Sequence, residues 1–193
     1  MSLPSEPRTA TRLTRWVVCG GLAGALLSAA VGAQARLATS GEIELRAAFV
    51  SKFPHFIEWP VRATAGRNEL ELCLPAGTAE AVPLGDMVAG YTVNGLPMRV
   101  RTLAPGDGAA ACHLLYLPQE RASERAARVR EAMGQPIVTV SDAPDFLTAG
   151  GMIRLRLDRG HLRFDINLSP AEASGLRLSS QLLRLAGHVM GGR

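Results

Sequence analysis

CHLLYLP, residues 112–118, is the stretch of sequence that decides the fold. Its nearly continuous run of apolar residues is typical of a strand that is buried on both faces. QPIVTVSD at residues 135–142 has the same character, and residues 123–134 between them have a helical pattern. Buried strands that alternate with helices indicate an α/β fold with a mainly parallel sheet flanked by helices.

Helical spacing of apolar residues extends this pattern to other segments. A short helix is expected near residues 77–90, and a last one from about Ser179 to Met190. Pro54 should kink an opening helix whose predicted buried stripe is Leu45, Phe49, Phe53, Phe56 and Ile57. The helix at 123–134 is predicted to turn its arginines to solvent and to bury Ala122, Ala126, Val129 and Met133.

Alternating residues predict further strands. NELELCLP, residues 68–75, places leucines on one face and Glu69, Glu71 and Cys73 on a solvated face. Asn94-Gly95 indicates a tight turn before another strand. Residues 152–167 predict a C-terminal antiparallel hairpin with one apolar and one arginine-rich face. SPAE at 169–172 then predicts a helix that is capped by Ser169.

The first residues resemble an export signal. Arg8, Arg12 and Arg15 precede residues 16–31, which carry no charge, and an Ala-x-Ala pattern ends at Ala35. We expect a signal peptide at residues 1–35 and a single mature domain at residues 36–193, delivered to the periplasm. An uncleaved membrane anchor is the alternative.

The net charge points away from nucleic acid as a partner. The formal charge is +4, but the leader holds three of the arginines and one glutamate. Lys52 is the only lysine, and the remaining arginines are interspersed with acidic residues. A nucleic-acid-binding protein usually shows a clustered basic face, so this class is not expected.

Cys73 and Cys112 are the two cysteines that remain after removal of the leader. In an oxidising compartment they favour a structural disulfide, which on the chain-entropy model would contribute about 4 kcal/mol. The spacing does not fit a zinc site or a Cys-x-x-Cys motif. A Cys-His nucleophile at Cys112-His113 and a redox-sensing bridge stay open as alternatives.

No catalytic, metal or cofactor motif is recognisable in the sequence. There is no Gly-x-Ser-x-Gly elbow, no His-Glu-x-x-His and no phosphate-binding glycine loop, and the histidines of the mature chain are scattered. The sequence therefore favours a binding or regulatory protein over an enzyme, with no cofactor.

Several blocks together resemble the YfiR-like family of exported proteins. They are FIEWP (56–60), ELCL (71–74), CHLLYL (112–117), IVTVSD (137–142), GGMI (150–153), LRFDINL (162–168) and LRLSSQLLRLA (176–186). The paired cysteines of that family match Cys73 and Cys112. Pro54 departs from the family pattern, and the second disulfide of some members has no counterpart here.

The resemblance implies a function that the residues alone do not. YfiR-like proteins are periplasmic repressors that bind the sensor domain of an inner-membrane diguanylate cyclase, lower cyclic di-GMP and biofilm formation, and typically dimerise. If the first and last elements pack together as in similar proteins, Arg62 and Arg177 would hold an anionic small ligand, with Asp165 at the rim. Arg154, Arg156 and Arg163 form a rival surface for a protein partner. The second functional hypothesis is a ligand-binding accessory protein for another membrane sensor or transporter.

Overall fold

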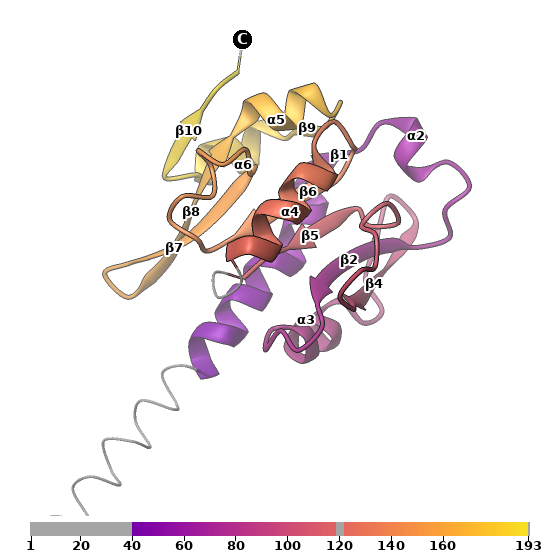
Figure 1. The fold of residues 1–193 in the computed structure, drawn as a ribbon, viewed down its shortest axis with the longest axis horizontal. Coiled ribbons are helices and arrows are strands. Elements are labelled where there is room, and N and C mark those ends of the chain that lie inside the picture. Colours follow the sequence, from indigo (N-terminus) through magenta and orange to yellow (C-terminus); the bar gives the residue numbers. More distant parts are fainter. Residues whose placement is uncertain (1–39, 119–121, 193) are drawn as a thin grey trace, which may run out of the picture. The chain divides into compact units, whose positions relative to one another are not determined.

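The computed structural model describes residues 40–118 and 122–192, and an eight-stranded sheet runs through them (Figure 1). The strand order is β10-β8-β7-β6-β5-β2-β4-β3. Five neighbouring strands are mutually parallel: β4 (Leu96–Leu103), β2 (Leu70–Pro75), β5 (Leu114–Tyr116), β6 (Val138–Ser141) and β7 (Ile153–Asp158). The sheet confirms the predicted α/β class.

Antiparallel pairs extend the sheet at both sides. β3 (Thr92–Val93) returns on β4 through Asn94 and Gly95, whose φ angles of 52° and 82° confirm the predicted tight turn. On the other side β8 (His161–Asn167) is antiparallel to β7, and β10 (His188–Met190) is parallel to β8. A separate pair joins β1 (Ile57–Glu58) to β9 (Arg177–Leu178).

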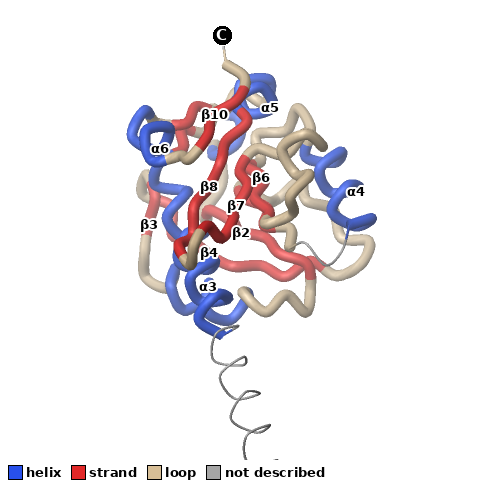
Figure 2. The backbone as a smooth tube through the Cα atoms, turned by 90° about the vertical axis from the view of Figure 1, so that its left-hand side faces the viewer, coloured by secondary structure: helices blue, strands red, loops and turns tan. Residues whose placement is uncertain are grey.

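Two apolar cores lie on opposite faces of the sheet. Leu72 and Leu114 point into the first core, whereas their neighbours Cys73 and Leu115 point into the second, as strand alternation requires. The helical residues 40–52 and α3 (Ala81–Val88) cover the first core, and α4 (Ala122–Ala132) covers the second. Figure 2 shows α4 and α3 on opposite sides of the strands.

The opening helix changes form at Pro54, as predicted. The α-helix gives way to a 3-10 turn, η1 (Phe53–Phe56), before β1 begins. Phe53 packs edge-on against Phe164 with ring centroids 5.4 Å apart. The prediction that Leu45 is buried was wrong, because this side chain is 37% exposed. The inward face contains Ala47, and two residues correspond to about 200° of helical rotation, which turns Leu45 outward.

The predicted buried face of α4 was wrong except for Val129, which is 3% exposed. Met133 is 60% exposed, whereas Arg125 and Arg128 are 8% and 6% exposed. The inward residues are Arg125, Arg128, Val129 and Ala132, and the predicted Ala122 and Ala126 are exposed. Backbone carbonyls in the loop before β5 accept hydrogen bonds from Arg128, which lets this guanidinium be buried.

The last predicted helix is shorter than expected. α6 (Ser180–Leu185) is capped by Ser179, whose side-chain oxygen accepts a hydrogen bond from the amide of Leu182, but the helix ends at Leu185. The amide of Gly187 then donates to the carbonyl of Phe164 at 2.8 Å, which directs the chain into β10. A Cβ at Gly187 would lie 2.8 Å from Nη2 of Arg156 and 3.1 Å from Oδ1 of Asp165, so a larger residue here would displace the ends of these two side chains.

The start of α5 (Leu168–Ala173) also differs from the prediction. Its cap is Asn167, whose side-chain oxygen accepts a hydrogen bond from the amide of Ser169 at 3.2 Å. Ser169 therefore lies inside the helix, two residues after the actual cap. An asparagine side chain is as good a helix cap as serine, so the sequence contained two competing signals.

Residues from Ser40 onward form one compact unit. Within the described ranges, no helix combines the length and the apolar character needed to cross a membrane. The predicted signal peptide at residues 1–35 lies outside the described residues.

Candidate functional site

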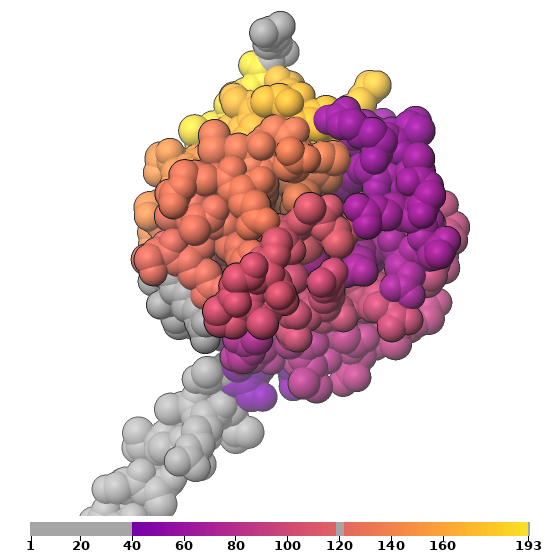
Figure 3. Space-filling view, turned by 45° about the vertical axis from the view of Figure 1, so that its right-hand side comes forward, coloured from indigo at the N-terminus to yellow at the C-terminus, as the bar shows by residue number. Residues whose placement is uncertain are grey.

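Arg62 connects the early part of the fold to its C-terminal part. It lies on α2 (Val61–Thr64), a single turn that follows Pro60. Its Nη2 donates a hydrogen bond to the carbonyl oxygen of Ser174 at 2.6 Å. A Cβ at Gly175 would lie 3.1 Å from that nitrogen, and the φ of Gly175 is 75°. Figure 3 shows the violet segment around α2 against the yellow C-terminal segment.

The pairing of β1 with β9 brings Arg177 to the same junction. Glu58 is the register partner of Arg177, and the Arg177 Nε lies 3.7 Å from Oε2 of Glu58. Both side chains are largely exposed, at 83% and 71%, so this ion pair adds little stability. The first and last elements thus pack together, with one arginine tied to a carbonyl and the other beside a carboxylate.

A pocket of about 230 Å³ opens beside Arg62 at the amino ends of β2, β5 and β6. It is lined by Arg62, Ala63, Arg67, Ala110, Cys112, His113, Gln135, Pro136 and Ile137. No carboxylate lines it, and within residues 40–118 and 122–192 neither Arg62 nor Arg67 makes an ion pair. Two guanidinium groups without acidic partners make this pocket suitable for an anion.

His113 forms a buried wall of this pocket. Its Nδ1 accepts a hydrogen bond from the amide of Glu71 at 3.0 Å, and its Nε2 lies 3.1 Å from the carbonyl oxygen of Ala63. These two bonds require the neutral tautomer with hydrogen on Nε2. Burial, the largest cause, lowers the pKa of His113, and the positive charge of Arg67 acts in the same direction. The ring of Trp59 packs edge-on at a centroid distance of 6.2 Å.

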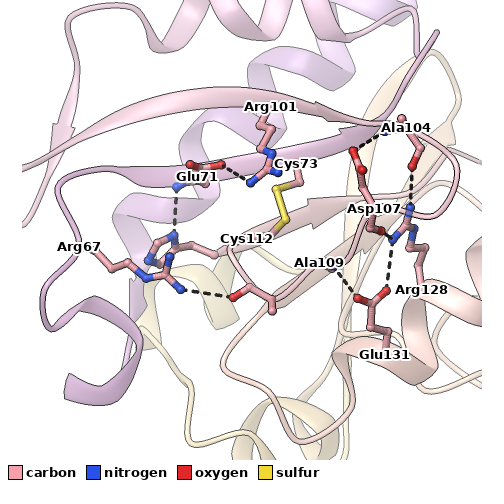
Figure 4. The surroundings of a disulfide bond; sticks show 12 residues. Arg67, Glu71, Cys73, Arg101, Ala104, Asp107, Ala109, Cys112, Arg128 and Glu131 are labelled. Atoms are coloured by element: carbon pink, nitrogen blue, oxygen red, sulfur yellow. Dashed lines mark hydrogen bonds and ion pairs between the residues drawn. A yellow bond between two sulfur atoms is a disulfide. The ribbon is translucent and has the colours of Figure 1, made fainter.

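The predicted disulfide is present and lies next to the pocket. The sulfur atoms of Cys73 and Cys112 are bonded, and their Cα atoms are 5.8 Å apart (Figure 4). The bond joins β2 to Cys112, which lies two residues before the first residue of β5. Cys73 is fully buried, which corrects the prediction that it lies on a solvated face of its strand. Glu69 and Glu71 on that face remain partly exposed and pair with Arg99 and Arg101 of β4.

α4 holds the loop that carries Cys112 from the other side. Arg128 donates hydrogen bonds to the carbonyl oxygens of Asp107 and Ala104 (Figure 4). Glu131 accepts one from the amide of Ala109 at 2.5 Å. The loop of residues 104–112 is therefore fixed twice, by a covalent bond to β2 and by partly buried polar contacts to α4.

Asp165 has different neighbours from those expected for a ligand-site residue. It is 2% exposed on β8. Its Oδ2 lies 2.5 Å from Nη2 of Arg154 and 3.1 Å from Nε of Arg156. The structure thus brings together Asp165, Arg154 and Arg156. Among the contacts of the described residues, Asp165 has none with Arg62 or Arg177.

The carboxyl ends of the parallel strands, where α/β proteins commonly bind ligands, are filled by side chains of the protein. The hydroxyl of Tyr116 donates to Oε1 of Glu80 at 3.1 Å, and Nη1 of Arg46 lies 3.3 Å from the same oxygen. Asp142 adds a second carboxylate at 3.7 Å from Arg46. Burial and these carboxylates raise the pKa of Tyr116, so its hydroxyl stays protonated.

The arrangement supports binding of an anion more readily than catalysis. Among the described residues, no group of three or more His, Cys, Asp or Glu side chains is placed to hold a metal ion. Of the residues that line this pocket, the sequence suggested Arg62 as a ligand-binding candidate, Cys112 as a disulfide cysteine and His113 only as part of a Cys-His nucleophile, whereas Arg67 was missed. The position of Arg67 directly before the strand predicted at residues 68–75 was a signal, since residues that precede neighbouring parallel strands meet at one sheet edge.

The chain matches a protein-family model described as YfiR/HmsC-like over residues 43–187. The match begins in the opening helix and ends just before β10, so it includes α2, the disulfide and the β7–β8 hairpin. It agrees with the resemblance carried by the sequence blocks from FIEWP to LRLSSQLLRLA. The chain therefore belongs to the YfiR/HmsC-like family.

Proposed function

We propose that this protein is a periplasmic repressor that binds the sensor domain of an inner-membrane diguanylate cyclase and thereby lowers cyclic di-GMP and biofilm formation. The observation that carries the proposal is the YfiR/HmsC-like match across residues 43–187, in a regulatory family. The export-like first residues and the disulfide suit a protein that works in an oxidising compartment. Repression needs only a higher affinity for the inactive state of the partner than for its active state.

The test is intracellular cyclic di-GMP in a strain that lacks this gene, beside its parent and a strain complemented with the wild-type gene. Deletion should raise cyclic di-GMP and complementation should reverse the rise, because the cyclase loses and then regains its inhibitor. Levels that stay the same under several growth conditions would refute the proposal. Sedimentation of the purified mature protein measures its mass in solution and so tests for the homodimer that the family resemblance implies.

The pocket beside Arg62 favours a second function, the binding of a small anion for a membrane sensor or transporter. Titration calorimetry with a panel of phosphorylated and carboxylated metabolites should show binding that Arg62→Ala weakens by about tenfold or more, since a charge-assisted hydrogen bond contributes about 1.5–3 kcal/mol. Arg177→Ala measures whether the exposed arginine of β9 belongs to the same site. Arg159→Ala, which removes an exposed arginine between β7 and β8, is the control. Equal binding by wild type and Arg62→Ala would exclude this pocket as the anion-binding site.

A further inference from the structure

The far half of the β7–β8 hairpin extends beyond the rest of the sheet. β6 pairs with β7 as far as Arg154, and β10 pairs with β8 from Asp165 onward. Residues 155–164, which we call the distal hairpin, are therefore paired as strands only with each other among the described residues, and the bond from Gly187 to the carbonyl of Phe164 lies at their base. Figure 1 shows this orange hairpin projecting from the body of the domain.

One face of the distal hairpin is apolar and becomes exposed toward the turn. At its base, Leu155 and Phe164 are buried, and Phe164 contacts Phe49 and Phe53 of the opening segment. Farther out, Leu157 is 50% exposed, whereas its register partner Leu162 is 8% exposed and belongs to the core. The hydrophobic core thus supports the distal hairpin as far as Leu162 and leaves Leu157 open to a partner.

The opposite face carries arginines in an unfavourable arrangement. Arg156 and Arg163 are register partners directly across the two strands. Arg156 is neutralised by Asp165 and Asp158, at 3.1 and 3.2 Å. Arg163 is exposed and makes no ion pair within the described residues. Like charges opposite each other destabilise a strand pair, so Arg163 does not serve the stability of a ribbon that lacks other strand neighbours.

We propose that the distal hairpin is the docking surface for an acidic groove of the protein partner. Arg163 would pair with a carboxylate of the partner, and Leu157 would pack against an apolar wall of the same groove. Arginine is enriched among the residues that dominate binding energy at interfaces, whereas lone exposed charges contribute little to folding. The identity of the partner rests on the proposed function, in which it is the sensor domain of the cyclase.

The two exposed groups lie on opposite faces of the ribbon, because side chains alternate along a strand. A flat anionic membrane would contact one face and leave the other in water. A groove contacts both faces at once, and therefore the arrangement favours a protein over a lipid surface.

The test uses the gene-deletion strain complemented with wild type, Arg163→Thr or the control Arg130→Ala, which removes an exposed arginine of α4. A second readout places a photoreactive amino acid at position 157 and identifies the cross-linked peptide in living cells. Wild type and Arg130→Ala should lower cyclic di-GMP. Arg163→Thr should fail to do so, with a cross-linking yield reduced by about tenfold or more. The melting temperature of purified Arg163→Thr should be no lower than that of wild type, because the like-charge pair is gone.

The outcomes separate this proposal from the proposed function. Repression by Arg163→Thr equal to that of wild type overturns the docking surface and leaves the repressor function intact. If wild type itself fails to lower cyclic di-GMP, the repressor function is wrong and the cross-link decides alone. An adduct with an acidic peptide of one identified envelope protein, lost in Arg163→Thr, supports the docking surface. An absent adduct, or one that is unchanged in Arg163→Thr, overturns it.

Discussion

At the scale of single residues, His113 shows how the backbone fixes the state of a buried side chain. Its two ring nitrogens bond to the amide of Glu71 and the carbonyl of Ala63, which belong to different segments. Protonation would place a hydrogen on Nδ1, which would then face the N–H of Glu71 and could no longer accept its hydrogen bond. The neutral ring therefore joins the edge of β2 to α2, while Arg67 keeps positive charge in the adjoining pocket.

The stability of the protein should fall as the pH falls below about 6.5, the ordinary pKa of histidine. The pKa of His113 is lowered in the native state. Between the two pKa values the unfolded chain binds a proton that the native protein does not, so acid favours unfolding. Urea unfolding from pH 8 to pH 5 measures this, with His113→Asn expected to show a smaller loss over the same range.

His161→Asn is the matched control, because His161 is an exposed histidine at the start of β8. It should show the same pH dependence as wild type. If His113→Asn loses as much stability as wild type between pH 8 and pH 5, the two backbone bonds of His113 do not account for the acid sensitivity.

At the scale of elements, the loop of residues 104–112 depends on a covalent and a polar attachment. The Cys73–Cys112 bond secures its end, and Arg128 and Glu131 of α4 secure its middle. Loss of Arg128 leaves loop carbonyls without a donor, and loss of the disulfide frees the end of the loop. Each attachment keeps in place the groups that the other one uses.

Removal of both attachments should therefore cost less than the sum of the separate losses. Cys73→Ala/Cys112→Ala should lower the free energy of unfolding by about 2–5 kcal/mol, and Arg128→Ala by about 1–3 kcal/mol. A urea-denaturation cycle with the triple variant measures their interaction, which should reach at least about 0.5 kcal/mol. Arg130→Ala in place of Arg128→Ala is the control and should be additive. Additive losses for Arg128→Ala would show that the attachments are independent.

The elements also show which features a sequence can predict. The strands at 112–118 and 135–142 were predictable because a strand buried on both faces needs a continuous apolar run. The buried face of α4 was not, because Arg128 is stabilised by carbonyls that lie far away in sequence. β10 was missed because a contact of Gly187 with Phe164 ends the helical pattern. In the candidate site, the cysteines followed from compartment chemistry, but the role of His113 depends on Ala63, fifty residues earlier.

At the scale of the whole molecule, two surfaces lie at opposite edges of the parallel strands. The pocket with Arg62 and Arg67 is at the amino ends of β2, β5 and β6. The turn of the distal hairpin follows the carboxyl end of β7, which runs in the same direction as those strands. An anion in the pocket and a protein on the distal hairpin would not compete for space. Both could therefore bind at the same time, and the binding of one could change the affinity for the other.

The disulfide has a mechanical consequence as well. It closes a covalent ring between Cys73 and Cys112, with a sequence separation of 39, which encloses α3, β3 and β4. If the two ends of the chain were pulled apart, tension would cross from one sulfur to the other and bypass this ring. The segment with α3, β3 and β4 would carry no load and would add no length to the stretched chain until the bond was reduced.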